Sequence, residues 1–117
     1  MPHARLAVLL VDDNQDHAQT LAVLLRLAGY EVVTALSAEQ GLAALRTGSF
    51  VAVITDLNMP RKTGSAMLAE AKAAGLLDHT GALVLTSAPH EVVGWRALDK
   101  LADVDVLLAE LESLRRS

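Results

Sequence analysis

The sequence predicts an α/β domain: one doubly wound parallel sheet with helices on both faces. Short apolar runs alternate along the chain with segments whose apolar residues recur at helical spacing. This order is typical of a parallel sheet, because parallel neighbours are joined by crossover connections that are usually helices. The length of 117 residues and the hydrophobic content of 52% suit one aliphatic core. We therefore expect a single domain over residues 1–117.

Four short apolar runs predict the first four strands, at residues 6–11, 31–35, 50–55 and 82–86. The first helix lies between the first two runs. It is indicated by Gly29 in the position of a C-cap glycine and by an apolar stripe with i, i+3, i+4 and i+7 spacing, formed by Leu21, Leu24, Leu25 and Ala28.

Local signals also predict the next helices. Ser37 and Gln40 have the spacing of a capping box, which begins a helix that closes at Gly48. Two further helices are expected, over residues 63–74 and 90–101. Trp95 lies in the second of these, where it is either a core residue or an exposed anchor for a partner, and we favour the anchor.

The C-terminal segment allows two interpretations. Residues 104–106 alternate between apolar and polar as a strand does. A longer stripe with i, i+3, i+4, i+7 and i+10 spacing is typical of a helix, and consists of Val104, Leu107, Leu108, Leu111 and Leu114. We predict a fifth strand at residues 104–108, followed by a short last helix.

Acidic residues directly follow two of the predicted strands. Asp12 and Asp13 come after the first strand, and Asp56 comes after the third. Flavodoxin-like sheets have the strand order 2-1-3-4-5, and their ligands bind beyond the carboxyl ends of the strands, where the order reverses. In that order the first and third strands flank this point, so we expect the three carboxylates to converge.

Converging carboxylates predict a metal-dependent chemistry. Three close carboxylates repel one another unless a cation lies between them. Mg²⁺ prefers such oxygen ligands, and it can draw charge from a phosphoryl group in transfer. An Asp carboxylate can be the nucleophile. A single Asp at a strand end is commonly a cap or turn residue, so the prediction depends on all three together.

The composition excludes several other classes. The chain has no Cys, which excludes disulfides and thiolate sites. A formal net charge of -4 gives no reason to expect binding to nucleic acid or an anionic membrane. No apolar run approaches the roughly 20 residues that cross a bilayer, and the N-terminus does not look like a signal peptide. We expect a soluble cytoplasmic protein.

Three motifs, in this order, resemble the receiver domains of two-component response regulators. They are LLVDDN at residues 9–14, VITDLNMP at residues 53–60 with Gly64 after it, and LVLTSA at residues 83–88. The resemblance covers nearly the whole chain and implies the flavodoxin-like strand order 2-1-3-4-5. It also implies a regulatory domain rather than an enzyme, apart from self-catalysed phosphorylation and dephosphorylation.

The resemblance implies the roles of the site residues. Asp56 would be the phosphoacceptor. Thr86 would hydrogen-bond a phosphoryl oxygen and shift inward upon phosphorylation, and Ser87 would be the small residue that leaves room for the phosphate. Mg²⁺ (or Mn²⁺) would be held by Asp12 (partly through water), Asp13, Asp56 and the backbone carbonyl of Asn58.

The sequence departs from the family near its C-terminal end. The family has a Lys at the end of the fifth strand, a Pro after it, and often a Tyr or Phe three residues before it. In the predicted layout these positions fall on Leu108, Ala109 and Asp105. Arg61 and Lys62, in the phosphoacceptor loop, are then considered as replacement cations.

The resemblance implies a sensor histidine kinase or a histidine phosphotransfer protein as the phosphoryl donor. It also implies a downstream protein of unknown identity, and a homodimer of the kind receivers often form. An alternative is an atypical receiver that binds proteins largely independently of phosphorylation, which Leu108 and Asp105 would favour. A phosphatase with an Asp nucleophile fits less well, because Asn58 stands where such enzymes have a second Asp.

The four histidines show no metal-ligand spacing with one another. We interpret His3, His17, His79 and His90 as surface residues, although His17 lies near the start of the first helix and close to the acidic pair.

Overall fold

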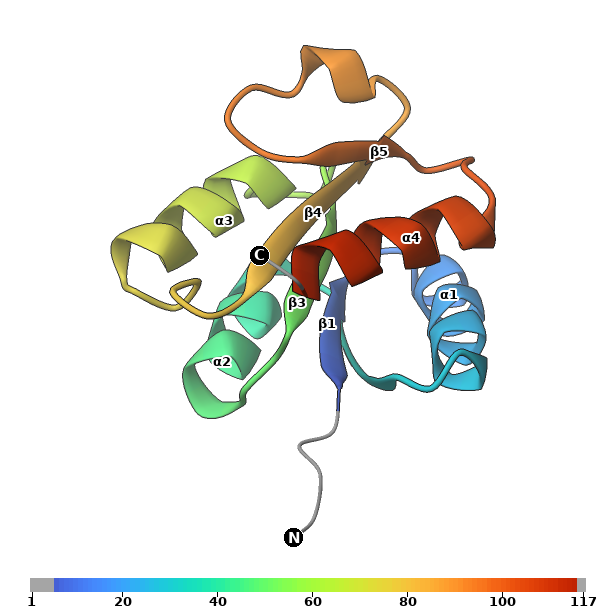
Figure 1. Ribbon diagram of the computed structural model, residues 1–117. Helices are drawn as coiled ribbons and strands as arrows, with labels where there is room; N and C mark the ends of the chain where they lie inside the picture. Colours follow the sequence, from blue (N-terminus) through green and yellow to red (C-terminus); the bar gives the residue numbers. More distant parts are fainter. Residues whose placement is uncertain (1–5, 116–117) are drawn as a thin grey trace, which may run out of the picture.

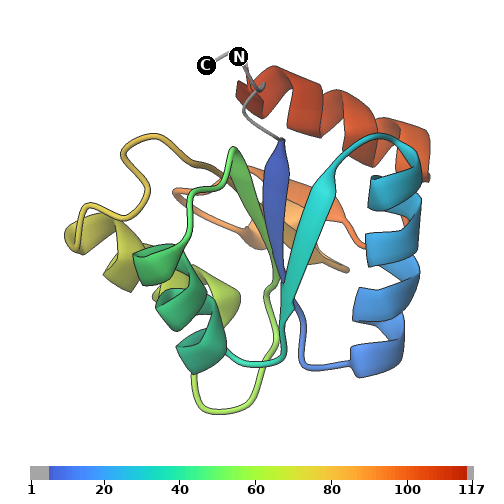
Figure 2. The same ribbon diagram turned by 90° about the horizontal axis from the view of Figure 1, so that it is seen from below.

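The computed structural model describes residues 6–115 of the chain. It contains a five-stranded sheet between two pairs of helices (Figures 1 and 2). The elements, in chain order, are β1 (Ala7–Val11), α1 (Gln15–Leu27), β2 (Glu31–Ala35), α2 (Ala38–Thr47), β3 (Ala52–Asp56), α3 (Gly64–Ala73), β4 (Gly81–Thr86), the 3₁₀ turn η1 (Pro89–Glu91), β5 (Ala97–Asp99) and α4 (Val104–Arg115). The strand order is β2-β1-β3-β4-β5 with parallel pairing throughout, which confirms the predicted fold class.

The sheet separates two hydrophobic cores. Helices α1 and α4 cover one face, and α2 and α3 cover the other (Figure 1). Successive strand residues point to opposite faces. On β1, Val8 and Leu10 therefore pack with α1 and α4, whereas Leu9 and Val11 pack with α2 and α3. Burial on both faces explains why the central strands are continuous apolar runs.

The helix ends predicted by local signals are confirmed. The Ser37 hydroxyl accepts a hydrogen bond from the Gln40 N–H (3.1 Å), and Gln40 Oε1 accepts one from the Leu36 N–H (2.9 Å). Gly29 and Gly75 follow α1 and α3 with φ of 102° and 77°. Glycine is favoured in this left-handed conformation because it has no Cβ.

The predicted helix over residues 90–101 is wrong. After β4 the chain forms only η1, and it then returns as β5, which pairs with β4 from Val84↔Ala97 to Thr86↔Asp99. All three residues of β5 are half-buried, so the strand shows no alternation that sequence analysis could detect.

Trp95 consequently lies in the loop between η1 and β5 rather than on a helix. Its side chain is half-buried against the core formed with α2 and α3. The Lys72 ammonium lies 5.9 Å from the centre of the Trp95 ring, within the range of a cation–π contact. The loop that replaces the expected helix thus covers part of this sheet face with an aromatic side chain.

The predicted fifth strand at residues 104–108 is also wrong. These residues begin α4, and the helical stripe was the correct alternative. Leu107 and Leu111 are buried in the core, whereas Val106 is 45% exposed. Helical spacing therefore decides which residues are buried, and the alternation over three residues does not. Among residues 6–115, no helix is long and apolar enough to cross a membrane.

Candidate functional site

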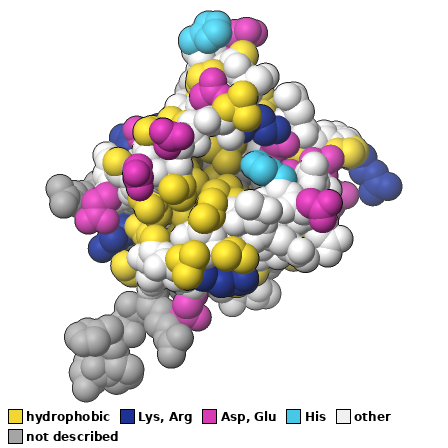
Figure 3. Space-filling view, turned by 90° about the vertical axis from the view of Figure 1, so that its right-hand side faces the viewer, with side chains coloured by type: hydrophobic (Ala, Val, Ile, Leu, Met, Phe, Trp, Pro, Cys, Tyr) yellow, Lys and Arg dark blue, Asp and Glu magenta, His cyan; other side chains and the backbone are white. Residues whose placement is uncertain are grey.

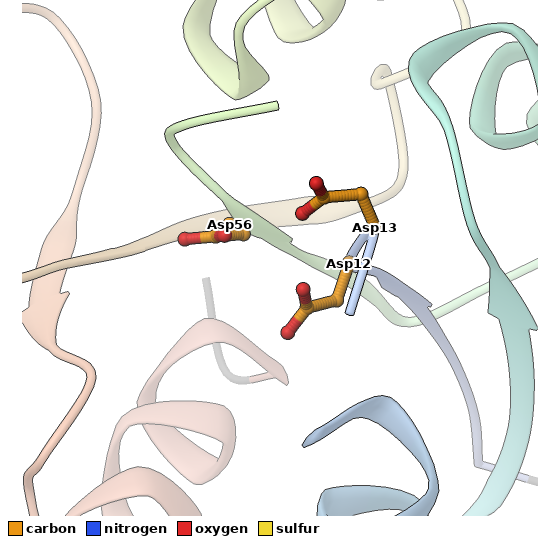
Figure 4. Close-up of side chains that lie close together, drawn as sticks. All are labelled: Asp12, Asp13 and Asp56. Carbon is orange, nitrogen blue, oxygen red and sulfur yellow. The ribbon is translucent and has the colours of Figure 1, made fainter. Parts of the chain in front are cut away.

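The carboxyl ends of β1 and β3 bring three aspartates together (Figure 4). Asp12 and Asp13 directly follow β1, and Asp56 is the last residue of β3. Ligand atoms from the three carboxylates lie within 4.8 Å of one another. Asp12 and Asp56 are only 2% and 5% exposed, whereas Asp13 faces solvent. The convergence predicted from the strand ends is therefore observed.

Backbone hydrogen bonds beyond the strand ends fix these aspartates. The Asp12 N–H donates to the Ala35 carbonyl (3.0 Å), which extends the β1–β2 pairing by one residue. The Leu57 N–H donates to the Leu85 carbonyl (3.0 Å), which extends the β3–β4 pairing past Asp56. The site therefore rests on the rigid sheet rather than on free loops.

A close backbone approach shapes the loop after Asp56. A Cβ atom at Gly64 would lie 2.3 Å from the Asp56 carbonyl oxygen, so only glycine fits there. The Gly64 N–H donates to the Leu57 carbonyl (2.8 Å), and the Thr55 hydroxyl donates to the Asp56 carbonyl (2.9 Å). These contacts hold the start of α3 against the end of β3.

Both oxygens of the Asp12 carboxylate have a partner. Oδ1 accepts a hydrogen bond from the Asn14 N–H (2.9 Å), and Oδ2 contacts His17 Nδ1. Asn14 is the N-cap of α1, and its side-chain oxygen accepts from the His17 N–H (3.1 Å). His17 is therefore a half-buried neighbour of the acidic cluster rather than a plain surface histidine.

Lys100, which the sequence analysis missed, supplies a cation to the cluster. It directly follows β5, and its Nζ lies 3.0 Å from Asp56 Oδ1. That oxygen is buried and has no hydrogen bond within the described residues, so the contact is an ion pair without hydrogen-bond alignment. The Lys100 N–H donates to the Thr86 carbonyl (3.1 Å). Burying the Asp56 charge requires such a partner.

The lysine of the expected family pattern is therefore Lys100, and its assignment to Leu108 is wrong. Leu108 is half-buried within α4, and Asp105 lies in the first turn of that helix. The residue after Lys100 is Leu101, and the residue three positions before it is Ala97. The chain thus has the cation of the pattern, but neither its proline nor its aromatic residue.

The two cations considered as replacements point elsewhere. Arg61 is exposed, and its guanidinium lies 3.6 Å from Glu39. The Lys62 ammonium hydrogen-bonds the Glu70 carboxylate, and this bond, together with the attraction of nearby positive charges, lowers the pKa of Glu70. Both side chains are thus paired with glutamates outside the acidic cluster.

Thr86 ends β4 beside the site and is 2% exposed. Its hydroxyl oxygen accepts a hydrogen bond from the Ala88 N–H (3.2 Å). Thr86, Ser87 and Asn58 line one pocket, which is distinct from the pocket that contains the three aspartates and Lys100. The hydroxyl is therefore engaged with the backbone of the β4–β5 connection.

An apolar groove adjoins the acidic pocket on the side of α1 and α4 (Figure 3). Its apolar walls include Leu24 of α1, Leu98 of β5 and Leu107 of α4. His17 and Lys100 line both the groove and the acidic pocket. The acidic cluster therefore borders a hydrophobic surface.

Comparison with known proteins gives one consistent family. Residues 8–108 match the family described as "Response regulator receiver domain". A response regulator receiver protein of Anaeromyxobacter sp. (strain Fw109-5) is 42% identical over 62 residues, which cover 53% of this chain and 26% of that protein. The transcriptional regulatory protein DltR of Streptococcus agalactiae (serotype III, strain NEM316) is 30% identical over 98 residues, or 84% of this chain and 43% of DltR. The chain thus corresponds to less than half of each relative.

Solved structures agree with this family. The chemotaxis protein CheY4 of Vibrio cholerae is 30% identical, with a TM-score of 0.84, and the alignment covers 95% of this chain and 99% of CheY4. The response regulator TrrA of Thermotoga maritima, in complex with Mg(2+)-BeF, is 24% identical and shares the fold, with a TM-score of 0.84 over 93% of this chain and 98% of TrrA. The family match over residues 8–108, on a sheet of the expected order, shows that this chain belongs to the receiver domains of two-component response regulators.

Proposed function

We propose that this receiver accepts a phosphoryl group on Asp56, in a reaction that requires Mg²⁺ or Mn²⁺. A sensor histidine kinase or a histidine phosphotransfer protein is the proposed donor. The proposal rests on one observation: the buried Asp56 carboxylate lies against two further carboxylates on one side and the Lys100 ammonium on the other. We place the whole chain, residues 1–117, in this one cytoplasmic domain.

The residues of the acidic cluster fit a hard divalent cation. The negative charge of three carboxylates with ligand atoms within 4.8 Å of one another exceeds the single positive charge that Lys100 provides. In addition, Asp56 Oδ1 has no hydrogen bond within residues 6–115. Mg²⁺ prefers such oxygen donors. We assign it to Asp12, Asp13, Asp56 and the backbone carbonyl of Asn58. When bound, the ion neutralises charge that develops on the phosphoryl oxygens.

The other residues then have defined tasks in the transfer. A carboxylate oxygen of Asp56 attacks the phosphorus, the P–N bond of the donor phosphohistidine breaks, and its electron pair returns to the imidazole. The product is an acyl phosphate on Asp56. Lys100 pairs with a phosphoryl oxygen instead of the carboxylate. Thr86 releases the Ala88 N–H and hydrogen-bonds another phosphoryl oxygen, and Ser87 leaves room for the group.

The phosphorylated domain acts on a downstream protein and forms a homodimer in this proposal. The domain is regulatory, so its only turnover is its own phosphorylation and the hydrolysis of its acyl phosphate. Lys100 removes the main reason for the phosphorylation-independent alternative, because that alternative relied on an apolar residue at the lysine position.

Intact mass after incubation with acetyl phosphate tests the proposal. Wild type should gain one phosphoryl group only when Mg²⁺ is present, and Asp56→Ala should gain none. Asp78→Asn is a matched control, because this exposed acid lies next to β4 at the opposite end of the sheet. The absence of a mass gain in wild type, or an equal gain in Asp56→Ala, would contradict the proposal.

A further inference from the structure

We propose that His17 is a positioning residue of the metal site: it holds the Asp12 carboxylate in the orientation that binds the ion. The inference deepens the proposed function and rests on it, because it concerns the same acidic cluster. It is carried by the contacts of Asp12 and by the way in which α1 begins.

Asp12 is held at both of its oxygens. The Asn14 N–H donates to Oδ1 (2.9 Å), and His17 Nδ1 contacts Oδ2. An imidazole with its proton on Nδ1 donates this second bond. A carboxylate oxygen has two acceptor sites, so each oxygen keeps one free for the ion or for water bound to the ion. Two bonds at opposite oxygens also prevent rotation of the carboxylate about its Cβ–Cγ bond.

His17 is itself fixed by the start of α1. Its backbone N–H donates to the side chain of Asn14, the N-cap residue, at 3.1 Å. The turn that begins the helix therefore places the imidazole and the Asn14 N–H around the same carboxylate. The His17 side chain is 36% exposed, whereas that of Asp12 is 3% exposed, so the imidazole ring covers the Asp12 carboxylate on its solvent side.

The crowding of carboxylates makes this contact matter for metal binding. Asp12 lies within 4.8 Å of two other acids, whose repulsion would turn a free carboxylate away from the cluster. Without His17, the bond from the Asn14 N–H is the remaining hydrogen bond on the Asp12 carboxylate in the described structure. Removal of a residue that orients a metal ligand typically weakens metal binding about 10–100-fold.

The test measures Mg²⁺ binding to the unphosphorylated protein, from the amide chemical shifts of residues 12–14 and 56–58. His17→Ala should weaken binding about ten-fold or more. His17→Asn should restore most of it, because the amide nitrogen of Asn is as many bonds from the backbone as Nδ1. His79→Ala is the matched control, since His79 is an exposed histidine just before β4, at the far end of the sheet.

Two results would overturn the inference. The first is a His17→Ala variant that binds Mg²⁺ as tightly as wild type does. The second is a His17→Asn variant that binds Mg²⁺ as weakly as His17→Ala does, because this would mean that the bulk of the ring matters rather than its hydrogen-bond donor. If His17→Ala does not fold, His17→Asn is compared with His17→Gln, whose donor lies one bond further out. The same Mg²⁺ affinity in His17→Asn and His17→Gln would also overturn the inference.

The same titration separates failure of this inference from failure of the proposed function. If wild type shows no Mg²⁺ response at residues 12–14, both are overturned together. If wild type binds Mg²⁺ and is labelled on Asp56 but His17→Ala binds equally well, only the role of His17 is lost.

Discussion

At the scale of single residues, the Lys100 ammonium forms an ion pair with the buried Asp56 carboxylate at 3.0 Å. The Lys100 side chain is about one-third exposed, whereas the Asp56 side chain is almost fully buried. The Asp56 charge therefore depends on its partner more than the Lys100 charge does, because a buried anion cannot be compensated by water. A phosphoryl group on Asp56 would carry its negative charge toward the same ammonium.

We predict that Lys100→Ala lowers the rate of Asp56 labelling by acetyl phosphate about ten-fold or more. A hydrogen bond to a charged group contributes about 1.5–3 kcal/mol, and each ~1.4 kcal/mol of barrier is a factor of about ten. The rate is followed by intact mass at fixed Mg²⁺. Lys62→Ala should label as wild type does, because the Lys62 ammonium is paired with Glu70. Unchanged labelling of Lys100→Ala would remove this lysine from the reaction.

At the scale of elements, the observed structure differs from the predicted layout in the connection between β4 and β5. A 3₁₀ turn and a loop that contains Trp95 stand where a helix was expected, and β5 has three residues. The position three residues before Lys100 is occupied by Ala97 rather than by an aromatic residue. Thr86 is joined to β5 by its pairing with Asp99, and to this connection by the hydrogen bond from the Ala88 N–H.

The assignment of residues 104–115 to a helix makes a direct prediction about stability. Leu107→Ala should lower the free energy of unfolding by about 2–5 kcal/mol, because a 4% exposed side chain leaves a cavity. Val106→Ala should change it by no more than about 0.5 kcal/mol, because this side chain is 45% exposed. Urea unfolding measures both. A strand at 104–108 would instead place Val106 with Val104 and Leu108, so a larger cost at Val106 would refute the helix.

At the scale of the whole molecule, one sheet connects the acidic cluster to its edge. Thr86 pairs with Asp99, and the Thr86 carbonyl accepts the Lys100 N–H (3.1 Å). A shift of the Thr86 hydroxyl toward a phosphoryl group would free the Ala88 N–H, its present donor. The end of β4 is thus linked both to β5 and to the connection between them.

We therefore predict that beryllofluoride with Mg²⁺, a mimic of the phosphoryl group, shifts the amide resonances of β5 and of Ala88, and not only those of the acidic pocket. The shifts are read from ¹H–¹⁵N spectra, with Asp56→Ala as the control that should show none. Changes confined to residues 12–14 and 56–58 would favour the alternative of a binding module that depends little on phosphorylation.

The sequence by itself determined the fold class, the first four strands, the first three helices and the meeting of Asp12, Asp13 and Asp56. Periodicity and caps are local signals that the tertiary structure did not override. The meeting of the three aspartates follows from the sheet order, because ligands bind at the strand ends where that order reverses. Residues 97–99 and 104–108 were assigned wrongly, because a three-residue edge strand takes its hydrogen bonds from β4 and has no period of its own. Lys100 left one signal, since it is the only lysine after the fourth strand. The contact of Lys100 with Asp56 exists only because parallel strands bring residues distant in the sequence to one edge of the sheet. The contact of His17 with Asp12 exists only because the start of α1 turns the imidazole toward the same edge.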